Sequence, residues 1–384
     1  MTALIPLGVY VHWPYCARIC PYCDFNVLRA RGREVEAARL ATAIIDDLRA
    51  QAALTGPREL VSIFFGGGTP SLMDPARVAE IVDIARRLWT PAADLEVSLE
   101  ANPTDAEADR FGALADAGVN RLSLGLQALD DTALKFLGRN HDAAQGRRAA
   151  EVAARLFPRL SLDLIYALPG QSPADWTAAL RAAIALGAEH ISPYQLTIET
   201  GTAFDRAIRR GVFAPPGEDL AADLYDATQA VLEADGFEAY EVSNHARGAT
   251  ARSRHNLVYW RGHDYVGVGP GAHGRLTLNG TRNSTLAADR PGDYIAQAAA
   301  TGTGFSSREA LSAQDVAEER VISGMRVLEG IRFTEVAILG LSPAHPKVRN
   351  FVDLGLLVDD VERLRATADG RRVLDRLTTE LAIG

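Results

Sequence analysis

Between residue 9 and about residue 200, short apolar runs alternate with longer stretches in which apolar residues recur every three or four positions. The short runs are typical of buried strands and the longer stretches of amphipathic helices. The expected strands are 9–13, 60–65, 95–101, 121–127, 160–167 and 190–199. The expected helices are 34–54, 76–88, 106–117, 143–156 and 174–186. Repeated strand–helix units predict an α/β fold with a parallel sheet, either a partial barrel or a doubly wound sheet.

The pattern changes after about residue 200. The expected elements are a helix over 220–232, a strand over 238–243, a polar aromatic segment over 255–260 and a glycine-rich run over 267–274. The pair Asn279-Gly280 then predicts a tight hairpin turn. Beyond residue 310 the pattern predicts helices over 316–328 and 348–356, and a β-hairpin over 357–374 that turns at Asp369-Gly370.

This order of elements predicts three parts of the chain. Residues 1–215 form the core of βα units, and residues 216–305 form an extension that packs on the core through its helix, its strand and the 255–260 segment. Residues 306–384 form a small C-terminal, winged-helix-like α+β domain.

Unusual residues stand at the carboxyl ends of the expected strands. Cysteines follow the first strand, Gly66-Gly67-Gly68-Thr69 follows the second, and Glu100, Gln127 and Asp163 lie at or near the ends of the next three. In parallel α/β architectures, ligands bind at these strand ends. We therefore expect a single site fed by successive strands.

The three cysteines of the chain, Cys16, Cys20 and Cys23, lie within eight residues in a C-x3-C-x2-C pattern. One interpretation is a zinc site, which needs a fourth ligand such as His12. The other is an iron–sulfur cluster, which three thiolates would hold while one iron stays open to an exogenous ligand. The spacing favours the cluster, because zinc motifs usually pair two C-x2-C halves.

Composition narrows the functional classes. The 384 residues include 40 basic and 49 acidic side chains, with a net charge of −9, and 47% of the residues are hydrophobic. This balance is globular, and it argues against broad binding to nucleic acid, so we expect no nucleic-acid partner. No apolar run approaches the roughly 18 to 20 residues of a transmembrane segment, and neither end carries a secretion or lipidation signal. We expect a cytoplasmic protein.

Several longer motifs are more specific than the cysteine spacing. They are Gly8-Val9-Tyr10-Val11-His12, Cys20-Pro21-Tyr22-Cys23-Asp24-Phe25-Asn26, Phe65-Gly66-Gly67-Gly68-Thr69-Pro70-Ser71, Leu124-Gly125-Leu126-Gln127, Asp163-Leu164-Ile165-Tyr166-Ala167-Leu168-Pro169-Gly170-Gln171 and His255-Asn256-Leu257-Val258-Tyr259-Trp260. Together they resemble the HemW-type heme chaperones of the radical S-adenosylmethionine (SAM) superfamily, close relatives of the oxygen-independent coproporphyrinogen III oxidases. The resemblance implies a radical SAM partial (β/α)6 barrel.

The resemblance also implies the cofactors and their residues. Cys16, Cys20 and Cys23 would ligate one [4Fe-4S] cluster, and SAM would occupy the open iron as an exchangeable ligand. The residues expected around SAM are Tyr10, Tyr22, Gly67, Gly68, Thr69, Glu100, Gln127, Arg139 and Asp163. Backbone groups of the glycine run would approach the methionine part closely. Glu100 and Asp163 fit an ammonium or ribose partner, or else serve as structural carboxylates.

Two features favour a chaperone over an oxidase. The oxidases carry a further cysteine two positions after the last one of the motif and a longer leader, whereas Phe25 stands at that position and little sequence precedes Tyr10. The chaperones carry the His255-Asn256-x-x-Tyr259-Trp260 motif, and imidazole is a common axial ligand of heme iron. His255 is therefore the expected heme ligand, with His245 and His263 as alternatives. The implied partners are heme and an acceptor hemoprotein, and whether the protein is an enzyme stays open.

Two alternative functions follow from the same residues. One is SAM-dependent decarboxylation of porphyrinogen propionates, and the other is a zinc-stabilised binding module. The spacing Gly269-x-Gly271-x-x-Gly274 matches a dinucleotide-binding fingerprint, but a hairpin rather than a helix is expected after it, so we expect no such site. His273 is a candidate for the adenine side of the SAM site.

Overall fold

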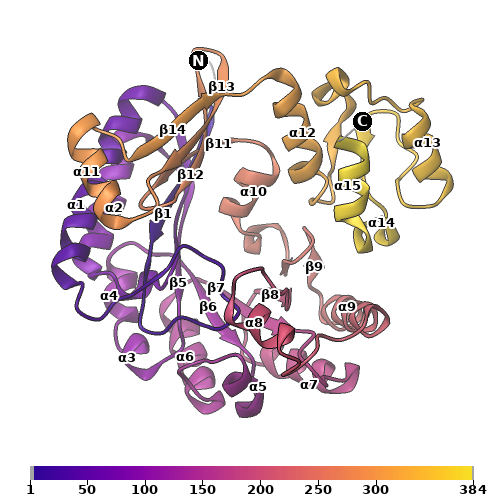
Figure 1. The fold of residues 1–384 in the computed structure, drawn as a ribbon, viewed down its shortest axis with the longest axis horizontal. Coiled ribbons are helices and arrows are strands. Elements are labelled where there is room, and N and C mark those ends of the chain that lie inside the picture. Colours follow the sequence, from indigo (N-terminus) through magenta and orange to yellow (C-terminus); the bar gives the residue numbers. More distant parts are fainter. Residues whose placement is uncertain (1–3, 383–384) are drawn as a thin grey trace.

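The central sheet contains twelve strands, and its middle part consists of six parallel strands that lie side by side in chain order (Figure 1). The computed structural model describes residues 4–382. The parallel strands are β1 (Pro6–Trp13), β4 (Glu59–Gly67), β5 (Thr90–Ala101), β6 (Arg121–Gln127), β7 (Arg159–Tyr166) and β8 (His190–Gln195). This order is that of a (β/α) barrel that stops after six units, as predicted.

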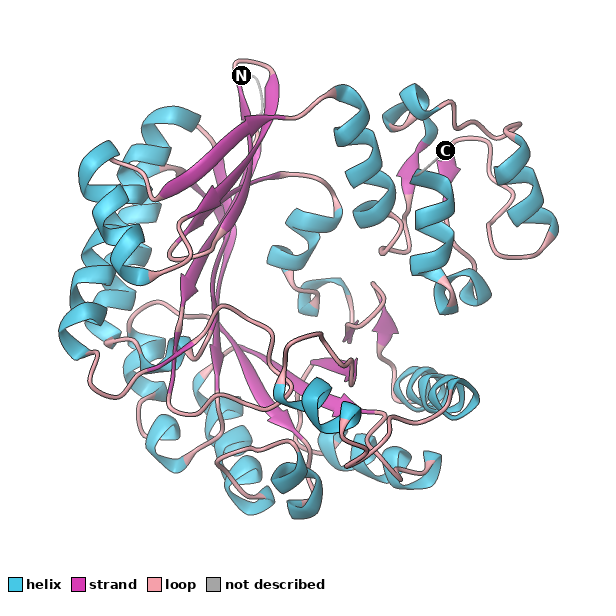
Figure 2. Ribbon diagram, in the orientation of Figure 1, coloured by secondary structure: helices cyan, strands magenta, loops and turns pink. Residues whose placement is uncertain are grey.

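The connecting helices cover the outer face of the curved sheet (Figure 2). They are α1 (Glu34–Thr55), α2 (Pro75–Leu88), α3 (Asp105–Ala108), α4 (Phe111–Asp116), α5 (Asp131–Phe136), α6 (Ala143–Leu156) and α7 (Pro173–Ile184). Asp74 and Ser172 cap α2 and α7, and a proline occupies the first position of each helix. Completely buried side chains such as Val9, Ile63 and Leu162 form the core that positions the strand ends.

Two predicted elements of the core differ from the structure. The helix expected over 106–117 is divided into α3 and α4, because Thr104 caps α3 and buried Glu107 turns its carboxylate back to Ser71 and Asn102. The strand expected to reach residue 199 ends at Gln195. The helix α5 was not expected.

The extension continues the same sheet at both ends. Strand β11 (Asp264–Val268) pairs parallel with β1, and β12 (His273–Leu278), β13 (Thr281–Ala287) and β14 (Phe305–Ala310) follow antiparallel. The hairpin turn at Asn279-Gly280 is confirmed, with both residues at positive φ. At the other end, β10 (His245–Ala246) and β9 (Glu238–Ala239) pair antiparallel beyond β8, so the strand expected over 238–243 is only two residues long.

Helix α8 (Ala203–Arg209) lies at the end of the core, and the helices of the extension are α9 (Glu218–Ala234), α10 (Arg254–Trp260) and α11 (Pro291–Thr301). Helix α11 packs on α1, and α9 packs on α7. Helix α10 lies instead on the inner side of the sheet, against β1, β4 and β11 (Figure 1). It carries the polar aromatic motif into the concave face.

The C-terminal segment has its own hydrophobic core, formed by residues such as Val321, Ile331 and Leu377. Its elements are α12 (Ala313–Gly324), β15 (Ile331–Arg332), α13 (Pro346–Asp353), β16 (Arg363–Leu364), α14 (Ala368–Arg372) and α15 (Leu374–Ala382). The hairpin predicted over 357–374 is wrong, because the chain does not turn at the predicted residues. Asp369 and Gly370 belong to α14, because Thr367 Oγ1 accepts a hydrogen bond from Gly370 N and so starts a helix there.

The chain reverses earlier, between Val358 and Arg365, whose backbones are hydrogen-bonded, and β16 pairs with β15 rather than with the strand expected after residue 370. The boundaries at residues 215 and 305 stay a prediction. Among residues 4–382, no helix is long and apolar enough to cross a membrane.

Candidate functional site

A cavity of about 750 Å³ lies at the carboxyl ends of the parallel strands. All thirteen residues predicted for the site line it, namely Tyr10, Cys16, Cys20, Tyr22, Cys23, Gly67, Gly68, Thr69, Glu100, Gln127, Arg139, Asp163 and His255. They come from the first five parallel strands, the loops that follow them and α10. The structure therefore brings the whole predicted set together, although it does not test which ligand each residue contacts.

The cysteine loop closes one side of the cavity. Cys16 is buried in β2 (Tyr15–Cys16), which pairs with β3 (Leu28–Arg29), whereas Cys20 and Cys23 are partly exposed. Burial raises the pKa of Cys16 to about 11, and burial also raises the pKa of Cys23. A metal that binds these thiols must displace their protons, and a nearby positive charge favours that step. Among the described residues, no three His, Cys, Asp or Glu side chains form a compact set for one metal ion.

The nearby positive charge is Arg139, which is almost completely enclosed. Its Nη1 donates to Cys20 Sγ at 3.3 Å and to Tyr22 Oη at 3.4 Å. Its Nη2 donates to Gly125 O at 3.1 Å and to Asn102 Oδ1. Although burial alone lowers the pKa of Arg139, its contacts with Tyr22 and Cys20 raise the pKa overall, so the guanidinium keeps its charge beside the thiols.

The glycine run turns sharply after β4 beneath the cysteine loop. Gly67 adopts φ +106°, and a Cβ at this position would lie 2.6 Å from the His12 ring. A Cβ on Gly68 would lie 2.8 Å from the backbone of Pro14. The N–H groups of Gly67, Gly68 and Thr69 already donate to Glu100, Trp13 and Tyr15. Any backbone group that this run offers a ligand is therefore a carbonyl oxygen, which suits an ammonium group.

Two buried carboxyl groups face the cavity. Burial and the neighbouring Asp163 raise the pKa of Glu100 to about 8. Burial raises the pKa of Asp163, although Ser123 Oγ donates to it at 2.8 Å and Ser161 Oγ at 3.2 Å. Perturbed carboxyl groups in a cleft are typical of functional sites, and both would be stabilised in ionised form by a cationic ligand.

Backbone strain marks the end of β6. Gln127 adopts φ 64°, and Ala128 N donates to Leu126 O at 2.8 Å across it, which makes a tight three-residue turn. This left-handed conformation is uncommon outside glycine, and such strain clusters at functional sites. Ala167, after the next strand, repeats the feature with φ 62°. Gln127 lines the cavity, and Ala167 directly follows β7, whose residues Asp163 and Ile165 line it.

The two tyrosines predicted for the SAM site come from different segments that line the cavity. Tyr10 belongs to β1, and a hydrogen bond of 3.0 Å joins its hydroxyl to His12 Nδ1. Tyr22 follows Cys20 and Pro21, and its ring packs against Phe204 of α8. Both rings are largely buried.

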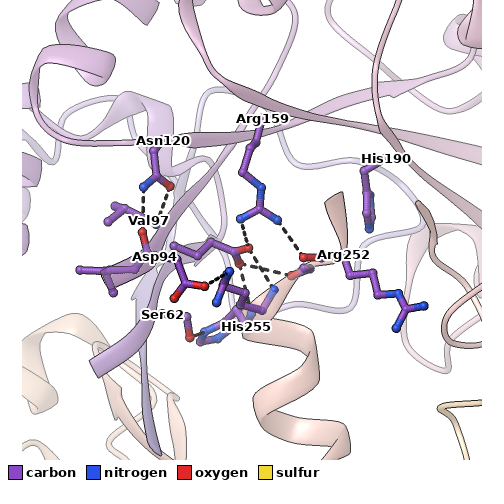
Figure 3. A network of polar contacts seen from close by, with 12 residues as sticks. Ser62, Asp94, Val97, Asn120, Arg159, His190, Arg252 and His255 are labelled. Carbon is purple, nitrogen blue, oxygen red and sulfur yellow. Dashed lines mark hydrogen bonds and ion pairs between the residues drawn. The ribbon is translucent and has the colours of Figure 1, made fainter. Parts of the chain in front are cut away.

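Helix α10 is anchored by a buried glutamate, and Figure 3 shows two of the residues bonded to it, Arg159 and His255. Glu96 of β5 accepts hydrogen bonds from Arg254 N at 3.0 Å and His255 N at 3.1 Å, and Arg159 Nη1 donates to it at 2.8 Å. Ser253 caps the helix by accepting from Asn256 N. The motif helix is thus attached to the sheet by a charge that lies outside the motif.

Both ring nitrogens of His255 are already bonded. Nδ1 pairs with Ser62 Oγ at 2.9 Å, and Nε2 pairs with Tyr259 Oη at 2.6 Å. Burial lowers the pKa of His255 to about 3, so the ring is neutral, and it stacks on Phe64. The ring would have to give up one of these bonds to bind iron, so its predicted role as a heme ligand stays a prediction.

The structure adds residues that the sequence did not indicate. Asn102 donates to Thr69 Oγ1 at 3.1 Å and accepts from Arg139, which links the glycine run to the thiol loop. Ser192 and Asn244 line the cavity and are hydrogen-bonded to each other at 2.7 Å. Only the position of Asn102, directly after a strand end, could have drawn attention to it. His273 is not among the residues that line this cavity, and its expected place on the adenine side of the SAM site stays a prediction.

Comparisons with known proteins agree with this geometry. Residues 10–183 match the family described as the radical SAM superfamily, and residues 311–373 match the HemN C-terminal domain. The chain is 36% identical to heme chaperone HemW of Escherichia coli, over 98% of both chains. It is 40% identical to the mitochondrial radical S-adenosyl methionine domain-containing protein 1 of Bos taurus, over 97% of this chain and 87% of the relative.

A solved structure shows the same fold. The chain aligns with coproporphyrinogen III oxidase (HemN) of Escherichia coli, a radical SAM enzyme, with a TM-score of 0.81 and 23% identity. The alignment covers 99% of this chain and 90% of that chain. At this identity the likeness concerns the fold alone.

The fold and the thiol loop define a member of the radical SAM superfamily. Within that superfamily, the chain belongs to the HemW family. The predicted cofactors, one [4Fe-4S] cluster and SAM, are those of the superfamily. The three cysteines therefore form a cluster site and not the zinc site of the alternative interpretation.

Proposed function

We propose that this protein is a heme chaperone that carries a three-cysteine [4Fe-4S] cluster with exchangeable SAM and delivers heme to an acceptor hemoprotein. The observation that carries the proposal is the meeting of the thiol loop and the His255–Trp260 motif helix at one cavity. The names of the bacterial relatives, which are heme chaperones at 33–36% identity, support the same function.

The residues present fit the cluster and SAM. Three thiols face the cavity with a buried guanidinium beside them, and carbonyl oxygens of the glycine run and two buried carboxyl groups can receive a cation. When bound, the cluster and SAM supply one-electron chemistry. The chain itself would hold the thiolates with Arg139, position the methionine part with Gly67 and Gly68, and exclude water with the rings of Tyr10 and Tyr22.

The second candidate is the porphyrinogen oxidase. It is favoured by the fold shared with HemN. It is disfavoured by Phe25, which takes the place of a further cysteine, has 62% of its surface exposed and offers no ligand atom at the cavity. Decarboxylation of coproporphyrinogen by the reconstituted protein with SAM and a reductant would support this candidate instead.

The acceptor and the location are also proposals. Transfer to an acceptor hemoprotein follows from the chaperone function. A cytoplasmic location is supported by the three free cysteines, because thiolates that ligate iron must stay reduced.

Anaerobic reconstitution followed by two parallel assays tests the function. We expect about four irons per chain, as one cubane cluster requires, a saturable Soret band on titration with hemin, and no protoporphyrinogen from coproporphyrinogen. Heme loss from the protein is measured by absorbance, and it should be faster in the presence of an apo-hemoprotein than in buffer alone. A protein that shows no saturable complex with hemin would contradict the proposal.

A further inference from the structure

A second cavity of about 470 Å³ adjoins the cluster cavity. It is bounded by β12, the motif helix α10 and α12 of the C-terminal segment, and Figure 1 shows α10 between the sheet and α12. Tyr10 and Tyr259 line both cavities. The two spaces are therefore neighbours with a shared wall of two tyrosine rings. A volume of this size is within the range of small-molecule sites.

The lining of the second cavity suits a flat, largely apolar molecule with acidic substituents. Tyr259, Trp260 and Tyr265 supply aromatic rings, and Val316 and Ile322 supply aliphatic surface from α12. Ile322 has 55% of its surface exposed in this setting. Aromatic and aliphatic side chains with a few placed polar groups are the usual composition of such sites.

Positive charge is available on the same lining. Arg275, Arg282 and Arg320 reach the cavity; Arg275 is paired with Glu319 at 2.6 Å and Arg320 with Glu335 at 2.9 Å, which leaves the charge of Arg282. Arg282 shares its partner Asp264 with Arg58, at N–O distances of 3.3 and 3.9 Å, so one carboxylate serves two guanidinium groups. A ligand carboxylate could pair with the undercompensated charge. The buried Nε1 of Trp260 has no hydrogen-bond partner among the described residues and is a further donor.

The histidines differ in whether their ring nitrogens are free. Three buried rings have hydrogen bonds on both nitrogens: His12, His190 and His255. Three others have one bonded nitrogen: His141, His245 and His345. Within residues 4–382, no side-chain hydrogen bond is found for His263 or His273. Of these two, only His273 lines the second cavity, and its side chain is exposed.

We propose that heme binds in this second cavity, with the imidazole of His273 as axial ligand to the iron and with Arg282 receiving a propionate. The inference rests on the proposed function, since it locates the cargo site of the chaperone. In this arrangement His255 is a positioning residue that holds the Tyr259 ring in the shared wall. The cluster cavity is left to the cluster and SAM.

Hemin titration of the full-length, cluster-loaded protein tests the axial ligand. Difference spectra are recorded against the same protein without hemin, which removes the absorbance of the cluster. We expect His273→Ala to lose the Soret and visible bands of histidine-ligated heme and to bind hemin at least tenfold more weakly. Imidazole added to His273→Ala should restore the bands, which a merely structural role would not produce. The matched control is His345→Ala, which should behave as the wild type.

The outcomes separate this inference from the function on which it rests. If the wild type binds hemin saturably and His273→Ala keeps its spectrum and affinity, the ligand assignment is overturned and the chaperone function stands. The assignment of His273 would also be overturned if His263→Ala lost the bands of histidine-ligated heme while His273→Ala kept them. If the wild type itself gives no saturable complex, the proposed function fails.

A second pair of measurements tests the carboxylate contact. Arg282→Gln should weaken the affinity for hemin by about tenfold, because a charge-assisted hydrogen bond is lost. The same variant should bind heme dimethyl ester, which lacks the carboxylates, as tightly as the wild type does. Equal weakening for both ligands would overturn the propionate contact.

Discussion

Arg139 and Cys20 are in direct contact: Nη1 donates to Sγ across 3.3 Å, although 119 residues separate them in the chain. Arg139 follows α5, and Cys20 lies in the loop after β2. The contact places a buried positive charge at the thiols that the cluster needs. Electrostatics of this kind tune both thiolate formation and cluster potential.

Arg139→Gln should weaken retention of the cluster about tenfold, because charge-assisted hydrogen bonds contribute about 1.5–3 kcal/mol. The measurement is the iron retained during anaerobic challenge with a chelator. Arg148→Gln is the control, since its ion pair with Asp105 is well exposed and should leave retention unchanged. Equal iron retention in Arg139→Gln and the wild type would show that the contact is dispensable.

Glu96→Gln should destabilise the protein by about 3 kcal/mol, because it removes the buried counter-charge of Arg159 and leaves only the longer contact with Glu189 at 3.8 Å. Urea unfolding followed by circular dichroism gives the free energy of unfolding. Asp94→Asn, which breaks the more exposed pair with Arg254, should cost about 1 kcal/mol or less. A Glu96→Gln cost as small as that of Asp94→Asn would refute the buried-anchor role.

The same glutamate makes stability fall in acid. Although burial alone raises the pKa of Glu96, Arg121 and Arg159 lower it overall. Its stabilisation is therefore complete above the ordinary glutamate pKa of about 4.3 and disappears as the pH falls through the lower folded-state value. The difference in unfolding free energy between wild type and Glu96→Gln should shrink below about pH 4. A pH-independent difference would contradict the assignment.

Glu100 should make the stability fall as the pH rises, which is opposite to the effect of Glu96. Its pKa is raised to about 8, so in the absence of ligand the folded protein holds a proton that the unfolded chain loses above about pH 4.3. The stability of the wild type relative to Glu100→Gln should decline as the pH rises from 5 to 8 and then level off. Thermal unfolding of both proteins across this pH range tests the direction of the change. A relative stability of the wild type that rises with pH would contradict the prediction.

Gly68→Ala should lower stability by about 1–3 kcal/mol and impair SAM binding, because the added Cβ meets the backbone of Pro14 at 2.8 Å. Gly112→Ala in α4 is the matched control, since its Cβ would meet nothing within 4 Å. That change should stabilise by about 0.5–1 kcal/mol. Thermal unfolding compares the stability of the two variants, and equilibrium dialysis compares their affinity for SAM.

The parallel core could be predicted because its strands are apolar and its helices periodic. Strand β6 was predicted at its observed bounds, since its three leucines alternate with serine and glycine at the period of a strand. The site residues could be predicted as a group because the carboxyl ends of parallel strands converge. Their individual contacts could not, because the partner of Cys20 lies more than a hundred residues away.

Features that depend on tertiary context escaped prediction. Helix α10 has only seven residues, and its N-terminus is held by Glu96, 159 residues before His255. The positive φ of Gln127 has no sequence signal, because the residue is not glycine. Asp369-Gly370 resembles a hairpin turn, but Thr367 two residues earlier caps a helix instead. In each case a distant or neighbouring contact outweighs the local preference.

The β12–β13 hairpin offers a way to follow the cargo. Strand β12 begins at His273, and the turn at Asn279-Gly280 projects into open space, where even a Cβ on Gly280 would meet no neighbour. At about 3.4 Å per residue, the turn is roughly 20 Å from His273. A fluorescent group inserted in the turn would be quenched by a heme at the strand's start. Heme arrival and hand-over could then be timed by emission, free of the cluster's own colour.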